Sequence, residues 1–439
     1  MNKNIAIIGG GMTGLVCGYK LSLLGYTITI YESSPQVGGL AAGFRLHGES
    51  LERAYHHLFM TDTDIIQLVA DLGLGSQLLW HNSSIASYYK GSLYPFGGAL
   101  DLLCFPPLSP ANRIRLAGVI YYLQKSENWQ KFSSITASAW LSKCCGRKVY
   151  ECIWEPLLKG KFHTYDKSVS MAWLWARVNT RANSRASLFD SEKLGYFKGG
   201  FQIVMDALVE KIKNNGGEIH TDARISSILS SHEDKAVTIS QDNTQTQFGS
   251  VIATVPSPVF SRLISKNSEA TPEYISKLES ISYLGAVCAV FSTKQSLSKY
   301  YWHNIQDSEA PYLAFIQHTN LVGAERYDNN HVYYLGAYVP HDHTYFTNSD
   351  NSIYDLFFSY LKKMFPDFNR ALIEEKHLFR FKNAQHVVDT TYASRIPDYR
   401  TRLPNVYLSN FSQIFPEDRG TNFSVREANK IVRMILNDK

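Results

Sequence analysis

Apolar runs separated by glycine predict alternating strands and helices at the start of the chain. Residues 5–8 form a run of mainly β-branched side chains, and residues 15–24 place apolar side chains at helical spacing until Gly25. A second β-branched run, residues 27–31, ends at Glu32. Strand, helix and strand in this order predict a βαβ unit, in which the helix joins two parallel strands.

The turn between the first strand and the helix has the spacing Gly9-x-Gly11-x-x-Gly14. Gly9 permits a tight turn, Gly11 lets a pyrophosphate approach the backbone, and Gly14 lets the helix pack closely on the strand. Free N–H groups at the helix N-terminus favour an anion there. Glu32 can accept hydrogen bonds from ribose hydroxyls and would repel the 2′-phosphate of NADP. The stretch therefore predicts a dinucleotide site that does not take NADP.

The following segments mix both periodicities. Residues 64–72 predict a helix, residues 88–96 a strand pair that turns at Lys90-Gly91, and residues 101–181 a mainly helical region. Residues 203–212 predict an amphipathic helix, and residues 250–255 a buried strand.

The last third of the chain predicts a second sheet and then a return to the first. The stretches GAVCAVF, YYWHNI, YLAFIQHTN and HVYYLGAYV within residues 270–378 predict strands. NVYLSN predicts a short strand near residue 408, and residues 425–436 an amphipathic helix.

Nucleotide-type segments therefore lie at both ends and in the middle of the chain. We expect a discontinuous nucleotide-binding domain of residues 1–80, 195–265 and 380–439, and a substrate domain of residues 81–194 and 266–379. No internal repeat or low-complexity tract interrupts this organisation.

Composition bounds the class of protein. Hydrophobic residues make up 44% and charged residues 19% of the 439, which is ordinary for a globular chain. The aromatic share of 13% indicates either a lined cavity or aromatic packing in the core. A net charge of +5 is too modest for a nucleic-acid binder. No Ser/His/Asp set points to a hydrolase. The composition thus favours an enzyme for a small-molecule substrate.

Cysteines and long apolar runs bear on the compartment. The six cysteines show no CxxC pair and no metal-ligand spacing, so no metal is expected and a reducing compartment fits. No apolar run reaches the ~18 residues of a membrane span, and the first strand leaves no room for a cleaved signal. We expect a cytoplasmic protein. Residues 106–125 predict a helix with apolar and basic residues, read either as buried or as a peripheral contact with a membrane.

Taken in order, these features resemble one superfamily. The N-terminal βαβ unit, Gly38-Gly39, the K-G-G-F and I-A-T-V-P stretches and the C-terminal strand, loop and helix are similar to FAD-dependent amine oxidases, protoporphyrinogen oxidases and phytoene desaturases, to which UDP-galactopyranose mutase is related. The resemblance covers nearly the whole chain. It implies an α/β fold, with a glutathione-reductase-type, Rossmann-like FAD domain and an inserted α+β substrate domain containing a mixed sheet.

The resemblance also implies residues that hold FAD. Leu40 departs from the pattern, because many oxidases of this group have Arg directly after the GG pair. Asn410 stands where the family usually has an acid toward the ribityl hydroxyls, and Asp418 with Arg419 forms either a local ion pair or a cofactor contact. The residues that the resemblance places against FAD are Gly9, Gly11, Thr13, Gly14, Glu32, Gly38, Gly39, Leu40, His57, Ile225, Asn410, Gly420, Thr421 and Asn422.

Catalytic and substrate candidates come from segments expected to face the flavin. His57 opens a stretch similar to the H-x-F-x-T-D of galactopyranose mutases, and either touches the flavin or is a hydrogen-bonded histidine of the domain crossover. His318 and His386 are acid–base candidates because histidine titrates near neutrality. The candidate substrate contacts are Gln317, Asn320 and Gln385, together with Arg181, which recurs with Arg177 and Arg185 on one helical face.

The favoured function is an FAD-dependent oxidoreductase that dehydrogenates a C–C or C–N bond of a largely apolar small molecule by hydride transfer to flavin N5. The alternative is a redox-neutral flavoenzyme, such as a sugar-nucleotide mutase that uses reduced FAD. Leu40 and the H-x-F-x-T-D stretch favour the mutase. The aromatic-rich middle favours the oxidoreductase, as does the lack of the arginine and tyrosine residues with which the mutases bind a diphosphate near the C-terminus. The sequence leaves the substrate, the electron acceptor and the oligomeric state open.

Overall fold

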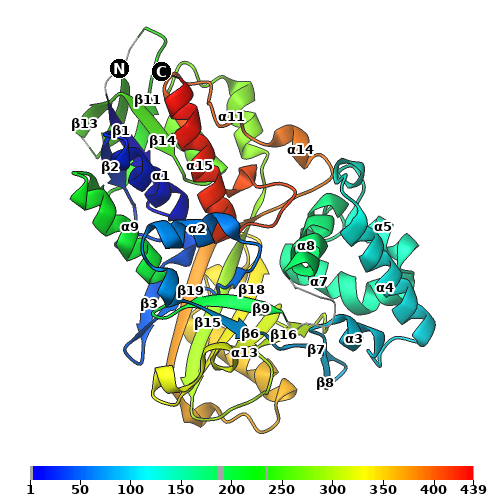
Figure 1. Cartoon of the computed structure of the whole chain (residues 1–439). Coiled ribbons are helices and arrows are strands. Elements are labelled where there is room, and N and C mark those ends of the chain that lie inside the picture. The colour runs from blue at the N-terminus through cyan, green and yellow to red at the C-terminus, as the bar shows by residue number, and fades with distance from the viewer. Residues whose placement is uncertain (1–2, 185–191, 234–235, 243, 439) are drawn as a thin grey trace.

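A five-stranded parallel sheet gathers segments from distant parts of the chain. The computed structural model describes residues 3–184, 192–233, 236–242 and 244–438. The sheet order is β10-β2-β1-β14-β20, and the fifth strand comes from near the C-terminus (Figure 1). The strands are β1 (Asn4–Ile8), β2 (Thr27–Tyr31), β10 (Glu218–His220), β14 (Ser250–Ala253) and β20 (Val406–Leu408).

The two faces of this sheet are covered by different elements. Strand β1 is apolar at every position from Ile5 to Ile8 because its side chains enter a core on both faces. Ile5 and Ile7 belong to the core under the helices, whereas Ala6 and Ile8 belong to the core of the opposite face. Helix α1 (Met12–Leu23) packs between α9 (Gln202–Asn214) and α15 (Thr421–Asn437). The other face is covered by the antiparallel strands β11 (Ile225–Leu229), β12 (Val237–Gln241) and β13 (Thr244–Phe248), and by α10 (Ser257–Ile264) and α11 (Pro272–Glu279).

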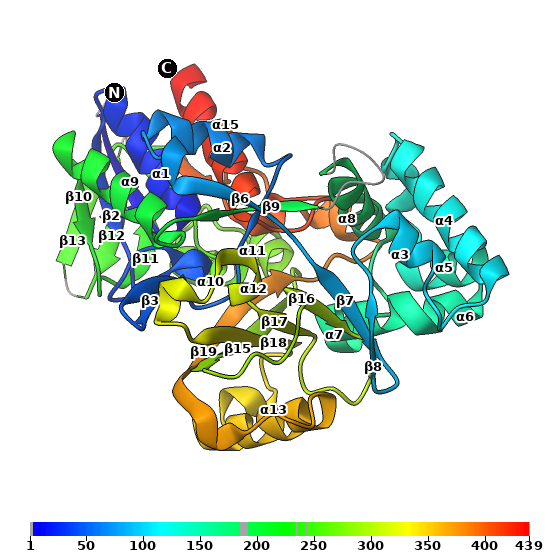
Figure 2. The same ribbon diagram turned by 60° about the horizontal axis from the view of Figure 1, so that its bottom comes forward.

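A seven-stranded mixed sheet forms the second layer of the molecule. Its order is β19-β15-β18-β17-β16-β7-β8, with β16 and β7 parallel and the other pairs antiparallel. Helix α13 (Asp350–Met364) packs on one face of it (Figure 2). The strands are β7 (Ile85–Tyr89), β8 (Ser92–Pro95), β15 (Tyr283–Thr293), β16 (Trp302–Ile305), β17 (Ala314–Gln317), β18 (His331–Val339) and β19 (Ile373–His386).

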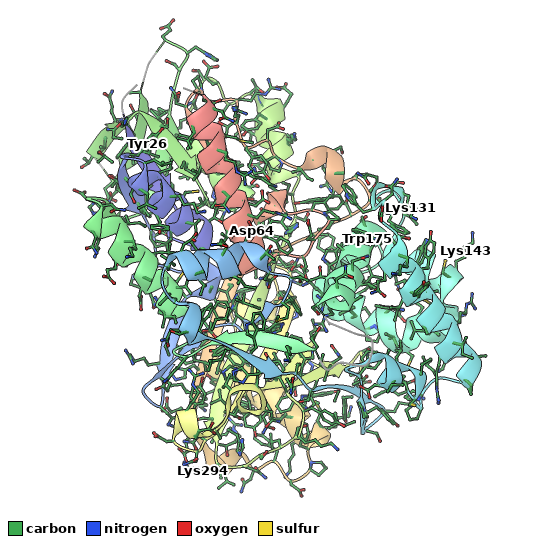
Figure 3. All side chains as sticks on the ribbon, viewed as in Figure 1. Tyr26, Asp64, Lys131, Lys143, Trp175 and Lys294 are labelled. Carbon is green, nitrogen blue, oxygen red and sulfur yellow. The ribbon has the colours of Figure 1, made fainter. Side chains whose placement is uncertain are left out.

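A helical lobe lies beside the sheets and has its own core around the fully buried Trp173. Trp175 Nε1 donates to the Ser126 carbonyl (2.9 Å), and this bond ties the helix that carries Trp175 to the loop after Lys125. Figure 3 labels Trp175, Lys131 and Lys143, which all lie on this lobe. Its helices are α3 (Ala99–Leu103), α4 (Pro110–Lys125), α5 (Ala137–Cys144), α6 (Arg147–Val149), α7 (Glu155–Phe162) and α8 (Met171–Asn183).

Small sheets and helices join these bodies. The hairpin β3 (Gly43–Leu46) and β4 (Glu49–Glu52) follows the first βαβ unit, and β9 (Lys193–Phe197) pairs with both β5 (Leu58–Phe59) and β6 (Leu78–Asn82). Helix α2 (Thr63–Asp71) packs against α15. Short helices occur at α12 (Thr319–Val322) and α14 (Tyr392–Arg395).

The predicted fold class is confirmed, with a parallel sheet, a separate mixed sheet and the expected hairpin turning at Lys90 and Gly91, both at positive φ. One assignment is wrong: Asn320 lies on α12 and not on a strand, because β17 already ends at Gln317. Among the described helices, none combines the length and apolar composition needed to span a bilayer.

Candidate active site

A large cleft opens at the carboxyl ends of the parallel strands, where ligands bind in open α/β sheets. This outer cleft holds about 2220 Å³ of space, part of it open to solvent. The predicted residues that line it are Gly9, Gly11, Thr13, Glu32, Gly38, Gly39, Leu40, Ile225, Asn410, Gly420 and Thr421.

The glycines form a cradle without side chains. Gly38 and Gly11 pair as an isolated β-bridge, and a Cβ built on Gly39 would lie 3.3 Å from Gly11 Cα. Gly14 does not line the cleft. A Cβ there would lie 2.0 Å from the Gly9 carbonyl oxygen, so Gly14 permits the packing of α1 on β1, as its spacing predicts. The two glycine segments therefore leave backbone exposed at the N-terminus of α1.

Glu32 ends β2 at the rim of this cradle and is largely buried. Its Oε2 accepts from the backbone N–H of Gly10 (2.8 Å), and its Oε1 accepts from that of Ser34 (2.8 Å). A carboxylate has about four lone-pair sites, so acceptor capacity remains for ribose hydroxyls. The residue therefore fixes the glycine turn and also lines the cleft.

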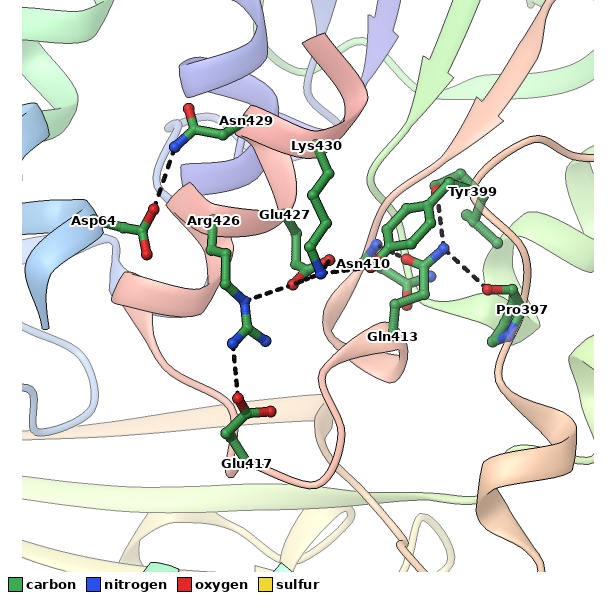
Figure 4. A network of polar contacts seen from close by, with 11 residues as sticks. Asp64, Pro397, Tyr399, Asn410, Gln413, Glu417, Arg426, Glu427, Asn429 and Lys430 are labelled. Atoms are coloured by element: carbon green, nitrogen blue, oxygen red, sulfur yellow. Dashed lines mark hydrogen bonds and ion pairs between the residues drawn. The ribbon is translucent and has the colours of Figure 1, made fainter. Parts of the chain in front are cut away.

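The N-terminus of α15 forms the opposite wall. Gly420 is its N-cap and Thr421 its first residue, with backbone N–H groups free for an acceptor. A buried ionic network holds this helix: Glu427 pairs with Arg426 (2.9 Å) and Lys430 (2.9 Å), and it accepts from Tyr399 (Figure 4). These contacts of α15 therefore fix the position of the helix N-terminus that forms this wall.

Two of the predicted cofactor contacts have most of their side-chain groups engaged within the protein. Asn410 Nδ2 donates to the Val255 carbonyl (2.8 Å), and its Oδ1 accepts from the Ser412 backbone (2.9 Å). Asn422 Oδ1 accepts from the backbone N–H of Ile65 (3.1 Å) at the start of α2, and Asn422 lines the inner cavity described below and not the outer cleft. Both side chains thus position backbone around the cleft.

The basic residues of the cleft were not predicted from the sequence. Arg53, Arg224, Arg262 and Lys382 line it, brought together from separate elements. Within the described part of the chain, the buried Nε atoms of Arg53 and of Arg419, which also lines the cleft, have no hydrogen-bond partner. The exposed glycine backbone, the acidic Glu32 and these open cationic donors fit a dinucleotide such as FAD.

A second cavity, the inner cavity, adjoins the cleft and spans about 1440 Å³, part of it open to solvent. The two share the wall residues Leu40, His56, Phe381, Arg419, Gly420 and Thr421. His57 lies in this inner cavity, where its Nδ1 is 3.2 Å from the Tyr301 hydroxyl. Burial, reinforced by Arg181, lowers the pKa of His57 to about 3, so the imidazole is neutral at ordinary pH.

Charged groups cluster in the inner cavity. Asp418 Oδ2 accepts from Lys161 Nζ (2.6 Å) and from Arg177 Nη1 (3.1 Å), and Arg419 Nη2 donates to the Tyr338 hydroxyl (2.8 Å). Of the two alternatives for Asp418 and Arg419, a local ion pair or a cofactor contact, the structure, which describes both residues, gives no direct contact between the two side chains, because each has another partner. Lys161 and Arg177, despite the burial of Asp418, hold the pKa of that carboxyl well below its usual range.

A third cavity extends from the inner one into the helical lobe. It holds about 2250 Å³ and shares Arg177, Arg181 and Leu313 with the inner cavity. Arg185, the third arginine of the predicted series, lies outside the described residues. The walls are mostly apolar and include Ile85, Phe96, Leu102, Leu116, Ile120, Ile153, Trp154, Leu157, Leu174 and Val178.

Several predicted catalytic and substrate residues do not line these three cavities. Gln317 and Gln385 are fully buried, and His318 and His386 nearly so. The positions expected for these side chains are therefore wrong. Burial lowers the pKa of His318 to about 3 and of His386 to about 4, which leaves both neutral.

Gln317, His318 and Asn320 instead have local hydrogen-bond partners, whereas among the described residues both ring nitrogens of His386 and Oε1 of Gln385 have none. Gln317 Oε1 accepts from the Ser298 backbone (2.9 Å), and Asn320 Nδ2 donates to the carbonyls of Ser298 and Tyr300 (2.8 Å each). The His318 ring lies among tyrosines, with its Nε2 3.2 Å from the Tyr327 hydroxyl. These residues stabilise the turns at the end of β17.

Comparisons with known proteins agree with this architecture. A family model described as flavin containing amine oxidoreductase matches residues 12–410. Coproporphyrinogen III oxidase of Staphylococcus aureus is 25% identical over 292 residues, which cover 59% of this chain and 62% of that protein. Protoporphyrinogen oxidase 2 of Arabidopsis thaliana is 22% identical over 293 residues, 58% of this chain and 57% of its own. The chain thus matches about three fifths of the length of these curated relatives.

Solved structures share the fold over the whole chain. A protein provisionally named a protoporphyrinogen oxidase, from Exiguobacterium sp. 255-15, has a TM-score of 0.78 at 18% identity, with 99% of each chain covered. Cyclohexylamine oxidase of Brevibacterium oxydans IH-35A has a TM-score of 0.75 at 13% identity, covering 100% of this chain and 99% of its own. The resemblance to UDP-galactopyranose mutase is not shown by these comparisons.

Proposed function

Because the chain belongs to the flavin-containing amine oxidoreductases and is therefore an FAD-dependent oxidoreductase, we propose that it dehydrogenates a C–C or C–N bond of a large, mainly apolar molecule with an anionic group. Bound FAD would supply the redox chemistry, taking two electrons from the substrate as a hydride at N5. The protein would supply orientation and the exclusion of water.

One observation carries this proposal: the three cavities share walls. The outer cleft meets the inner cavity at Arg419, Gly420 and Thr421, and the inner cavity meets the apolar cavity at Arg177 and Arg181. A substrate whose apolar body fills the helical lobe would thus present one end to the isoalloxazine. The mutase alternative has no comparable support, since in its H-x-F-x-T-D stretch Asp62 accepts from the backbone of Phe59 (2.8 Å) and stabilises a turn.

The charge of the inner cavity supports an anionic substrate. Lys161, Arg177, Arg181 and Arg419 line it with four cationic side chains, against the two acidic side chains of Asp418 and Asp62. Such an excess in a partly desolvated cavity disfavours a protonated amine and favours a carboxylate. We therefore favour an apolar acid, for which coproporphyrinogen III, named in the Staphylococcus aureus relative, is a suitable probe.

We propose the following cofactor contacts. Backbone at Gly9, Gly11, Thr13, Gly38 and Gly39 would face the pyrophosphate, with Arg53 supplying the cation that is missing at Leu40. Glu32 would accept from the adenosine ribose, and the main chain of Ile225 would face the adenine. Asn410 would lie toward the ribityl chain, and Gly420 and Thr421 would direct N–H groups at the flavin.

The decisive experiment mixes the oxidised holoenzyme anaerobically with coproporphyrinogen III, protoporphyrinogen, cyclohexylamine and putrescine, and follows flavin absorbance. We expect bleaching by the anionic tetrapyrroles and not by the amines. Bleaching by an amine alone would refute the anionic class, and bleaching by none would refute this substrate proposal. Isomerisation of UDP-galactopyranose only after prior reduction of the flavin would identify a mutase.

The helical lobe supports peripheral contact with an anionic membrane as the source of an apolar substrate. Ile114, Tyr121 and Tyr122 of α4 and Leu100 of α3 are between 48% and 69% exposed, and Tyr121 also lines the apolar cavity. Helix α4 therefore lies at the surface, which disagrees with the first of the two alternatives predicted for residues 106–125, a buried helix. We expect co-sedimentation with phosphatidylserine vesicles but not with phosphatidylcholine vesicles, because the Lys131 ammonium lies 3.1 Å from the Tyr122 hydroxyl, beside these exposed apolar side chains. Binding should weaken in Ile114→Ser, which removes an exposed apolar side chain from the helix.

A further inference from the structure

Tyr338 lies in the wall of the inner cavity with its hydroxyl beside a fixed cation. It belongs to β18 and is partly exposed to the cavity. Arg419 Nη2 donates to its hydroxyl oxygen at 2.8 Å, and Lys161 Nζ lies 5.4 Å from the centre of its ring. Two cations from different elements, the loop before α15 and helix α7, thus converge on one phenol.

Asp418 cannot neutralise both of these cations. Its carboxylate is shared between Lys161 and Arg177, while the side chain of Arg419 has Tyr338 as its hydrogen-bonded acceptor. The Tyr55 hydroxyl also interacts with that of Tyr338. The remaining ionisable neighbours, His56 and Cys288, are neutral, since burial lowers the pKa of His56 to about 4 and raises that of Cys288 to about 12. The phenol of Tyr338 is therefore the group best placed to balance the excess positive charge.

The physical consequence is a stabilised phenolate. Despite burial, Arg419 and then Lys161 lower the pKa of Tyr338 below its ordinary value. Burial and the neighbouring Glu52 raise the pKa values of Tyr196 and Tyr334 well above the ordinary value. Tyr196 has Arg326 over its ring (5.7 Å), but its hydroxyl donates to Glu52 and accepts no hydrogen bond from a cation among those found in the described residues. A charge-assisted hydrogen bond from arginine accounts for this difference.

We propose that Tyr338 is the proton acceptor of the dehydrogenation. Forming the new double bond removes two hydrogens from the substrate, one as hydride and one as a proton. Bound FAD would supply the acceptor for the hydride and its electron pair, and the Tyr338 phenolate would accept the proton and become a neutral phenol, which would lose the proton to solvent after product release. The inference rests on the proposed function, and it adds a catalytic residue that faces the same cavity as the substrate.

Tyr55 supplies a matched control. It lines the same cavity and its ring meets Trp302 edge-on at 4.9 Å, but it has no hydrogen bond from a cation among those found in the described residues. Burial and the neighbouring Tyr338 raise the pKa of Tyr55 well above its ordinary value. Removing its hydroxyl should therefore leave proton acceptance in place and weaken only the interaction with Tyr338.

The test compares the wild-type holoenzyme with Tyr338→Phe and Tyr55→Phe, using coproporphyrinogen III as the probe. In rapid anaerobic mixing, the rate of flavin bleaching in the wild type should rise with pH as Tyr338 ionises. We expect Tyr338→Phe to lower the limiting rate about 10²- to 10⁴-fold and to abolish this rise, with the dissociation constant of the probe changed only a few-fold. Tyr55→Phe should stay within about tenfold of the wild type.

A second measurement does not depend on turnover. Ultraviolet difference titration of the holoenzymes should show one phenolate that forms below pH ~10 in wild type and is lost in Tyr338→Phe. If the variant fails to retain flavin, 3-fluorotyrosine at position 338, a more acidic phenol, should shift the pH limb downward. An unchanged rate and pH profile in Tyr338→Phe, or an unmoved limb with fluorotyrosine, overturns the inference while leaving the proposed function intact. If coproporphyrinogen III does not bleach the wild-type flavin, protoporphyrinogen replaces it as the probe. Failure of both to bleach the wild-type flavin overturns the inference and the proposed function together, whatever the titration shows.

Discussion

Replacing Gly11 by alanine tests whether the glycine cradle serves the cofactor or only the fold. Gly11 has φ −75° and ψ 179°, a conformation open to any residue. A Cβ built there meets no protein atom nearer than Gly39 Cα at 4.0 Å. The empty chain should therefore accept the methyl group without strain, and reduced freedom of the unfolded chain should stabilise it by about 0.4–1 kcal/mol.

The loaded protein should respond differently, because the new methyl group stands in the space where the pyrophosphate approaches the backbone. Overpacking by one methyl group costs about 1–3 kcal/mol. That cost corresponds to a rise of roughly 5- to 150-fold in the dissociation constant of FAD. Titration of the apoprotein with FAD, followed by quenching of flavin fluorescence, measures the constant, and thermal unfolding of the apoprotein measures the stability.

Two controls separate binding from folding. Gly118→Ala adds the same methyl group in α4, where nothing lies within 4 Å, and should leave FAD affinity unchanged. Gly14→Ala places a Cβ 2.0 Å from the Gly9 carbonyl oxygen and should destabilise even the apoprotein. An unchanged dissociation constant in Gly11→Ala, or a destabilised apoprotein, would refute the assignment of this cradle to the pyrophosphate.

Two further predictions concern buried charge and substrate docking. Burial raises the pKa of Glu52 from its ordinary 4.5 to about 7, so the native state holds this proton where the unfolded chain has lost it. The free energy of unfolding should therefore fall by up to about 3 kcal/mol as pH rises from 4.5 to about 7. Urea titrations at several pH values measure this fall, which Glu52→Gln should remove. The same dependence of the unfolding free energy on pH in the variant would contradict the prediction. Arg181→Ala should raise the Michaelis constant for coproporphyrinogen III about tenfold or more, as loss of one charged contact implies, with the exposed Arg147→Ala as control. An unchanged constant in Arg181→Ala would discard docking at this helix.

Local patterns in the sequence were enough for the parts of the site that one short segment builds. The spacing of Gly9, Gly11 and Gly14 predicted both the turn and its packing, because the conformational freedom of glycine is a property of the residue itself. The hairpin at Lys90-Gly91 was foreseen for a similar reason. Apolar periodicity predicted a helix over residues 425–436, and the structure begins that helix earlier, at Thr421. Family resemblance then connected these segments to FAD.

The side chains around the reacting centre could not be foreseen in this way. Lys161 and Asp418 are separated by 257 positions, and only folding places their atoms 2.6 Å apart. Gln317 lies on a strand as expected and His318 directly follows it, yet both side chains are buried in packed surroundings away from the cavities. Periodicity reports that one face of an element is buried, but not which distant element covers it. The nucleotide turn was therefore determined by the sequence read locally, whereas the charge around Tyr338 was decided by tertiary structure, because long-range electrostatics depends on distances that exist only in the folded chain.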